Sequence, residues 1–153
     1  MRFEFATAGR ILFGPGASAN AASLAADLGR RAFVVTGQSP ERAAPLVQSL
    51  RAADIQIVEF RVSGEPTTHI ARAAAREARD SRCDFVVSFG GGSAIDLGKA
   101  CAALMANLGD VLEYLEVVGK GQPPPRRAAP HIALPTTAGT GAEVTRNAVL
   151  GSP

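Results

Sequence analysis

Three consecutive glycines followed by a serine are the residues of this sequence best suited to bind a ligand. Gly90-Gly91-Gly92-Ser93 come directly after residues 85–89, a run that is apolar and partly β-branched apart from one small polar residue and is typical of a buried strand. Glycines let a ligand approach the bare backbone. If a helix starts at Ser93, with Asp96 completing a capping box, the free N–H groups and the dipole of that helix form a site for an anion such as phosphate.

The residues of this turn leave simpler structural roles open. The glycines can serve only as a tight connection between a strand and a helix, and Ser93 and Asp96 can serve only as a cap. Two standard nucleotide-binding patterns are not matched. The pattern G-x-G-x-x-G has Ile95 in place of its third glycine, and the P-loop pattern has Ala100 where a Ser or Thr should follow Lys99. A P-loop ATPase or another nucleotide phosphohydrolase is therefore disfavoured.

Composition and charge describe an ordinary globular domain. The chain has 153 residues, of which 46% are hydrophobic and 20% are charged, so it can bury a core of its own. A net charge of +2, without a stripe of basic and aromatic residues, argues against nucleic-acid binding. We see no apolar run long enough to span a membrane and no signal peptide, and we expect a cytoplasmic protein.

Residue types that bind metals are few. Cys83 and Cys101 have no C-x-x-C partner, and we expect them to be buried, reduced thiols. His69 and His131 are the only histidines, and they do not form an H-x-x-x-H pair. We therefore expect no metal site made from the residues of this chain alone.

Strand and helix patterns alternate along the sequence. Strands are expected at 31–36, 55–60, 85–89, 131–134 and 144–150, and helices at 18–28, 40–53, 67–81, 93–107 and 111–115, with Ser39 and Thr67 as N-caps. Residues 3–5 and 10–13 are expected to pair as a short N-terminal β-hairpin. This alternation predicts an α/β domain, Rossmann-like and doubly wound, with a mostly parallel sheet and helices on both faces.

Small polar turns follow the predicted strands at the same edge of the sheet. Ligands of such folds bind at the carboxyl ends of the strands. The turns that fall there are residues 37–39, 64–67, 90–93 and 136–140. Their convergence makes a nucleotide the expected ligand of the glycine turn.

Two stretches resemble the signature motifs of iron-containing (group III) alcohol dehydrogenases. They are GGGSAIDLGKA at 90–100 and PTTAGTGAEVT at 135–145, and RILFGPGA at 10–17 is similar to the opening of that family. Glycerol dehydrogenases and dehydroquinate synthases share the fold but are less similar in these motifs. The resemblance covers essentially the whole chain, and it implies that residues 1–153 form an NAD(P)-binding α/β domain.

The resemblance also implies which residues contact the cofactor. These are Gly91, Gly92 and Ser93 at the pyrophosphate, Asp96 beside them, and Thr136, Thr137, Thr140 and Thr145 along the rest of the cofactor path. The residue chemistry agrees, because small residues admit the backbone and hydroxyls donate to phosphate and ribose oxygens. For the threonines, ordinary turn and strand capping is the alternative.

The loop after the strand at 31–36 bears on the choice between NAD and NADP. An acidic residue there favours NAD through the ribose hydroxyls, and the family often has Asp at this place. This sequence has Gly37, Gln38 and Ser39 instead. No carboxylate repels a 2′-phosphate and Ser39 can donate to it. We therefore expect Gly37 and Ser39 in the cofactor site, and NADP to be tolerated alongside NAD.

The family has a second, C-terminal helical domain that this sequence does not contain. In the family it supplies an Asp and three His that bind Fe²⁺ or Zn²⁺, and neither His69 nor His131 stands in such a motif. The resemblance thus implies no catalytic and no metal-binding residue in this chain, which would be inactive alone. It would be the nucleotide-binding half of an enzyme that transfers hydride between an alcohol or carbonyl compound and the nicotinamide.

Two further expectations concern partners. A non-catalytic dinucleotide-binding or assembly module remains the alternative function. Family members often dimerise through the N-terminal strand region, so a homodimer formed through residues 3–5 is possible, although this segment can instead pair with residues 10–13.

Overall fold

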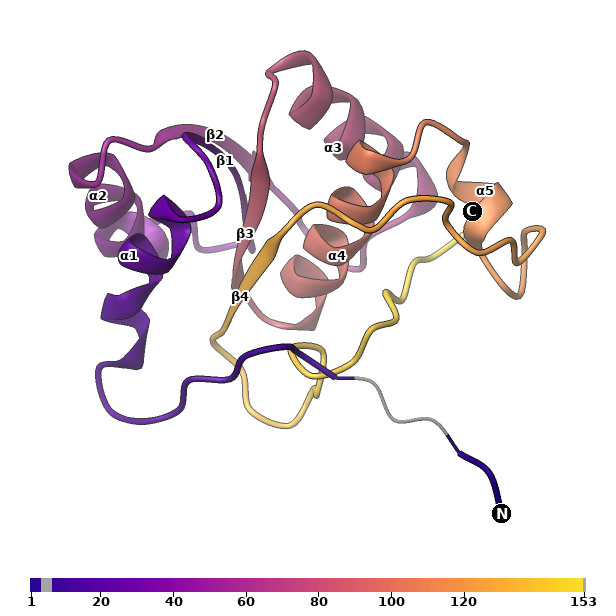
Figure 1. Ribbon diagram of the computed structural model, residues 1–153, viewed down its shortest axis with the longest axis horizontal. Helices are drawn as coiled ribbons and strands as arrows, with labels where there is room; N and C mark the ends of the chain where they lie inside the picture. Colours follow the sequence, from indigo (N-terminus) through magenta and orange to yellow (C-terminus); the bar gives the residue numbers. More distant parts are fainter. Residues whose placement is uncertain (4–6, 153) are drawn as a thin grey trace.

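A four-stranded parallel sheet forms the centre of the computed structural model, which describes residues 1–3 and 7–152 (Figure 1). The order of the strands is β2-β1-β3-β4. Their bounds are Arg31–Thr36 (β1), Gln56–Arg61 (β2), Phe85–Gly90 (β3) and His131–Pro135 (β4). Val87 pairs with Val34 of β1 on one side and with Ile132 of β4 on the other. The prediction of a mostly parallel sheet from these four segments is confirmed.

Helices cover both faces of the sheet. Figure 1 shows α1 and α2 on one face and α3 and α4 on the other. The bounds are Ala21–Ala26 (α1), Ala44–Ala52 (α2), Thr68–Asp80 (α3), Gly92–Ala106 (α4) and Val111–Tyr114 (α5), with 3₁₀ turns at Ala17–Asn20 and Pro40–Ala43 ahead of α1 and α2. The doubly wound architecture is therefore confirmed. No helix in the described ranges is long and apolar enough to cross a membrane.

The core divides into two clusters, one on each side of the sheet. Phe33 and Val86 belong to the cluster under α3 and α4, whereas Val34 and Val87 belong to the cluster under α1 and α2. Successive strand residues point to opposite faces, so a strand that is covered on both sides is apolar at nearly every position. This requirement explains why β1 and β3 could be located from their composition.

The predicted helix starts are partly correct. Thr67 caps α3, because its Oγ1 accepts a hydrogen bond from the backbone N–H of Ile70 at 3.3 Å. Ser39 precedes the first 3₁₀ residue, but its side chain makes no capping bond. The capping box at Ser93 is wrong, since α4 begins at Gly92 with Gly91 as its N-cap. Ser93 therefore lies inside the first turn, where its hydroxyl cannot cap.

The predicted N-terminal hairpin does not form in the part that is described. Residues 10–13 are not a strand, and Phe13 is fully exposed. Its intended partner, residues 3–5, lies largely outside the described residues. A two-stranded hairpin is marginal without a surface to cover. Thr7, in the intended turn, instead donates from its Oγ1 to the backbone oxygen of Val144 at 2.9 Å.

The predicted strand at 144–150 is also wrong. This segment runs past α4 towards the start of α3 instead of pairing along the sheet (Figure 1). A single parallel bridge joins Gly151 to Thr67. In that bridge the N–H of Thr68 donates to Gly151 O at 2.9 Å, and the N–H of Gly151 donates to Pro66 O at 2.9 Å. Only Gly151, just after the segment, pairs with the start of α3, so the apolar alternation at 144–150 does not produce a strand.

Candidate functional site

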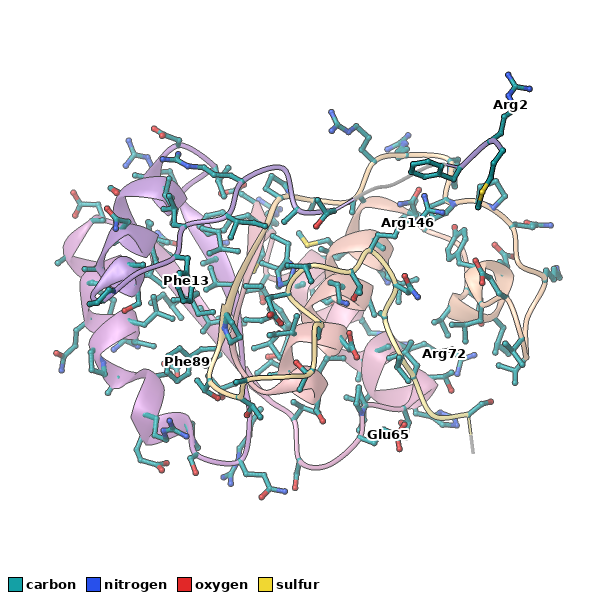
Figure 2. The ribbon with its side chains drawn as sticks, turned by 90° about the horizontal axis from the view of Figure 1, so that it is seen from below. Arg2, Phe13, Glu65, Arg72, Phe89 and Arg146 are labelled. Carbon is teal, nitrogen blue, oxygen red and sulfur yellow. The ribbon has the colours of Figure 1, made fainter. Side chains whose placement is uncertain are left out.

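A pocket lies at the carboxyl ends of β1 and β3. The chain leaves β1 to form β2 on one side, and later returns to form β3 on the other. This is the topological switch point of the sheet, where open α/β folds bind ligands. The pocket is lined by Gly37, Gln38, Ser39 and Arg42 after β1, by Phe89, Gly90 and Gly91 at the end of β3, and by Thr136 after β4. Figure 2 shows Phe89 at this end of the sheet, beside the bend that follows β4.

The glycine turn presents free donors at the start of α4. The first hydrogen bond of the helix runs from the N–H of Ile95 to the backbone oxygen of Gly91 at 3.2 Å. The N–H groups of Gly92, Ser93 and Ala94 therefore have no partner within the helix. With the positive end of the helix dipole they can bind an anion such as a phosphate.

The loop after β4 packs directly against this turn. A Cβ added to Gly91 would lie 3.2 Å from Thr137 Oγ1, and a Cβ added to Gly92 would lie 3.6 Å from Thr140. The N–H of Thr136 also donates to Gly90 O at 2.9 Å. The space that side chains at Gly91 and Gly92 would fill is thus occupied by Thr137 and Thr140. The sequence-based interpretation had assigned that space to a ligand.

Gly37 differs from these glycines because a side chain there would meet nothing. No heavy atom lies within 4 Å of a Cβ built on Gly37, whereas a Cβ on Gly90 would lie 2.8 Å from the Cβ of Ala94. The open space at Gly37 adjoins the pocket that this residue lines. A ligand can therefore come close to the backbone here, next to Ser39.

Lys99 ties the loop after β4 to α4. Its Nζ forms an ion pair with Asp96 Oδ1 at 2.7 Å and donates to Thr145 Oγ1 at 3.2 Å and to the backbone oxygen of Asn147. The side chains of Lys99 and Asp96 are only 12% and 13% exposed, so little water competes for these contacts. Asp96 and Thr145 therefore meet each other through Lys99 and are not among the residues that line the pocket.

Buried Ser88 and partly buried His131 form a pair beneath α4, away from the pocket lining. Ser88 Oγ and His131 Nε2 are 2.9 Å apart, and a Cβ on Gly98 would collide with Ser88 Oγ. Burial, with a smaller contribution from the charge of Lys99, lowers the pKa of His131 from its ordinary 6.5 to about 4. The imidazole is therefore neutral at pH 7, and the pair serves the packing of α4 on the sheet.

Other reactive groups are buried or scattered. Burial raises the pKa of Cys83 to about 11 and that of Cys101 to about 12, so both thiols are protonated at neutral pH. Both are free and buried, as predicted. Within residues 1–3 and 7–152, no three His, Cys, Asp or Glu side chains gather into a group that could hold a metal ion. We assign no metal ligand to these residues.

The structure gathers most of the predicted cofactor residues around one place. Gly37, Ser39, Gly91 and Thr136 line the pocket. The others nearby are in the first turn of α4 or packed on the glycine turn: Gly92, Ser93, Thr137 and Thr140. Their contact with a cofactor stays a prediction.

Two residues that line the pocket, Phe89 and Arg42, were not expected there, and Phe89 was assigned only to the core. Gln38 and Gly90 lie in the predicted turns at 37–39 and 90–93, but no cofactor contact was assigned to them. Arg42 lies three residues after Ser39, and this spacing brings residues together in the 3₁₀ turn at Pro40–Ala43. That spacing was the signal from which Arg42 could have been found.

The sequence and the fold both match known dehydrogenases. The family model of the iron-containing alcohol dehydrogenases matches residues 8–153. This chain belongs to that family.

Relatives within the iron-containing alcohol dehydrogenases differ in substrate and are much longer. The 4-hydroxybutyrate dehydrogenase of Cupriavidus necator is 38% identical over 117 residues, which are 76% of this chain and 30% of that protein. The sulfoacetaldehyde reductase of Bilophila wadsworthia is 33% identical over 155 residues, covering 98% of this chain and 39% of the relative. The chain thus corresponds to an N-terminal part of these enzymes and spans well under half of their length.

Solved structures of the family share the fold of this chain. A 1,3-propanediol oxidoreductase superposes with a TM-score of 0.90 at 29% identity, covering 99% of this chain and 40% of that one. The sulfoacetaldehyde reductase of Bifidobacterium kashiwanohense, solved in complex with NAD⁺, gives 0.84 at 32% identity, with 99% and 40% covered. The Rossmann-like fold predicted from the sequence is therefore confirmed.

Proposed function

We propose that this chain is the dinucleotide-binding part of an iron-containing, NAD(P)-dependent alcohol dehydrogenase. The observation that carries the proposal is a pocket at the switch point of the sheet, next to a helix start whose first three N–H groups have no partner within the helix. A relative with the same fold was solved with NAD⁺, which supports the same class of cofactor here. In the whole protein, the bound nicotinamide would exchange a hydride with an alcohol or carbonyl compound.

Each part of the site would have a distinct task. The N–H groups of Gly92 and Ser93 would donate to pyrophosphate oxygens, with the dipole of α4 favouring their negative charge. Thr137 and Thr140, packed on the glycine turn, would fix the loop after β4 beside the cofactor. Gly37 and Ser39 would lie at the ribose, where Gly37 leaves open space.

We propose that NADP is accepted alongside NAD. The described residues that line the pocket include no Asp or Glu, so no carboxylate there would repel a 2′-phosphate. Ser39 supplies a hydroxyl that could donate to it.

The remaining properties belong to the whole protein. We propose that Fe²⁺ or Zn²⁺ is bound by residues outside this chain, that the enzyme is cytoplasmic and forms a homodimer, and that residues 1–153 alone do not oxidise alcohols. The metal and the family name rest on the match to iron-containing alcohol dehydrogenases.

Calorimetric titration of the chain with NADH, NADPH and Mg·ATP tests the cofactor proposal. We expect saturable binding of a dinucleotide with a dissociation constant of about 1 mM or tighter, which corresponds to about −4 kcal/mol. Mg·ATP should not be hydrolysed. An absence of dinucleotide binding at several times that concentration would overturn the proposal.

The variant Gly91→Val is expected to weaken dinucleotide binding and so tests the location of the site. The backbone of Gly91 has φ −78° and ψ −168°, which any residue can adopt, so its effect would come from the side chain alone. That side chain would push Thr137 away and enter the pocket, and we expect at least about tenfold weaker binding. Gly9→Ala, where an added Cβ meets nothing within 4 Å, is the control and should bind normally.

A further inference from the structure

Arg42 is a charged group in the pocket whose guanidinium has no partner among residues 1–3 and 7–152. Among the described residues that line the pocket, it is the only charged one. It is exposed, and its guanidinium makes no hydrogen bond or ion pair with the rest of the described chain. Its neighbours in the lining are glycines, hydroxyls, an amide and a phenyl ring. A free guanidinium in such surroundings is a receptor for an anion.

The loop that carries Arg42 is anchored at the end of β1. The backbone N–H of Arg42 donates to Ser39 O at 3.2 Å, which closes the 3₁₀ turn. From the end of β2, Arg61 Nη2 donates to the backbone oxygen of Gln38 at 2.6 Å. These bonds fix the backbone of residues 38–42, from which both Ser39 and Arg42 line the pocket. The hydroxyl of Ser39 is not used as a cap, so it is available to a ligand.

The open space beside Gly37 is where an anion bound by Arg42 could lie. A Cβ on Gly37 would meet no heavy atom within 4 Å, so a group as large as a phosphate can lie beside the backbone. A bound ribose at this end of β1 would direct its 2′ position towards the same loop, as in other nucleotide-binding α/β folds, where an Arg accommodates the 2′-phosphate of NADP. Arg is suited to phosphate because its planar donors bind two oxygens at once.

We propose that Arg42, together with the Ser39 hydroxyl, binds the 2′-phosphate of NADP(H) and makes this protein prefer NADP(H) to NAD(H). The inference rests on the proposed dinucleotide site and adds to it the residue that determines the choice of cofactor. The pyrophosphate is the other phosphate that Arg42 could reach, and it occurs in both cofactors. If Arg42 contacts the 2′-phosphate, its removal weakens only NADPH binding. If it contacts the pyrophosphate, its removal weakens NADH binding as well.

Fluorescence titration of NADPH and NADH into the chain and its variants tests this role. The unaltered chain should bind NADPH at least about tenfold tighter than NADH, since hydrogen bonds between ionised groups are the strong ones. Arg42→Ala should weaken NADPH binding about tenfold or more and NADH binding less than about threefold. Arg42→Lys keeps the charge without the planar fork, and its affinity for NADPH should fall between those of the unaltered chain and Arg42→Ala.

Arg76→Ala is the matched control. Arg76 is an exposed arginine of α3, and its removal changes the net charge by the same amount. This variant should bind both cofactors as the unaltered chain does. Adenosine 2′,5′-bisphosphate should displace NADPH more strongly than 5′-AMP does, and this advantage should disappear in Arg42→Ala.

Three results would overturn the inference, and they are distinguishable. Equal affinity for NADPH and NADH in the unaltered chain removes the preference itself. An equal loss of both cofactors in Arg42→Ala assigns the guanidinium to the pyrophosphate. Failure of both cofactors to bind overturns the proposed function, and with it this role of Arg42.

Discussion

Close packing between the sheet and α4 requires a glycine at position 98. Gly98 has no side chain because Ser88 of β3 and His131 of β4 occupy the space in front of it. The pair is linked at 2.9 Å, and its histidine is kept neutral by burial. Sequence reasoning treated His131 only as a metal ligand to be excluded, because a histidine in an apolar strand shows no partner until β3 and β4 are paired.

The neutral His131 should make stability depend on pH. Its pKa is about 4 in the folded chain against 6.5 ordinarily, so between these values the unfolded chain binds a proton that the folded chain does not. Stability is then fully present above about pH 6.5 and decreases as the pH falls towards 4. We expect a loss on the order of 2 kcal/mol between pH 7 and pH 4.5, measured by urea unfolding.

A variant separates this effect from general acid sensitivity. His131→Asn should be less stable at pH 7 but should lose less stability on acidification than the unaltered chain. His69→Asn alters the other, exposed histidine and should leave the pH dependence as it was. An identical slope in His131→Asn and the unaltered chain would show that another group is responsible.

At the scale of elements, burial decides which predictions are correct. Segments covered on both faces could be located from the sequence, since β1 carries an apolar run and the run of β3 is interrupted only by Ser88. Residues 10–13 and 144–150 have similar local patterns but lie at the surface, where their conformation depends on a partner. Their patterns alone could not distinguish a strand from an extended loop.

The loop after β4 depends on one lysine. Lys99 is 12% exposed and pairs with Asp96, so Lys99→Met would leave a largely buried carboxylate without its partner and release Thr145 and Asn147. We expect a loss of about 2 kcal/mol or more and faster hydrogen exchange over residues 139–147. Exchange measured by mass spectrometry would show it.

The matched control for Lys99→Met is Lys120→Met, which removes an exposed lysine that does not take part in the contacts of Lys99. It should leave both stability and exchange over 139–147 nearly unchanged. Unaltered protection of that loop in Lys99→Met would mean that the threonine–glycine packing holds it without the lysine.

At the scale of the whole molecule, the location of the site was predictable and part of its composition was not. Alternating strands and helices imply a parallel sheet, and the turns after its strands must then share one edge. Gly37 and Gly91 were found in this way. Arg42 could have been found from its spacing to Ser39 in the turn at Pro40–Ala43. The contacts of Lys99 with Thr145 and Asn147 could not be derived from local patterns, because they involve a segment predicted as a strand.

The central claim is that this edge of the sheet holds a dinucleotide, and backbone amide NMR on the chain tests it most directly. Addition of NADPH should shift amide signals in three segments that meet at the pocket, residues 37–42, 90–94 and 136–140. Signals from the last turn of α3, residues 77–80, which lead into β3 and therefore lie at the opposite edge of the sheet, should stay in place. Shifts confined to other surfaces, or none at saturating NADPH and NADH, would contradict the account.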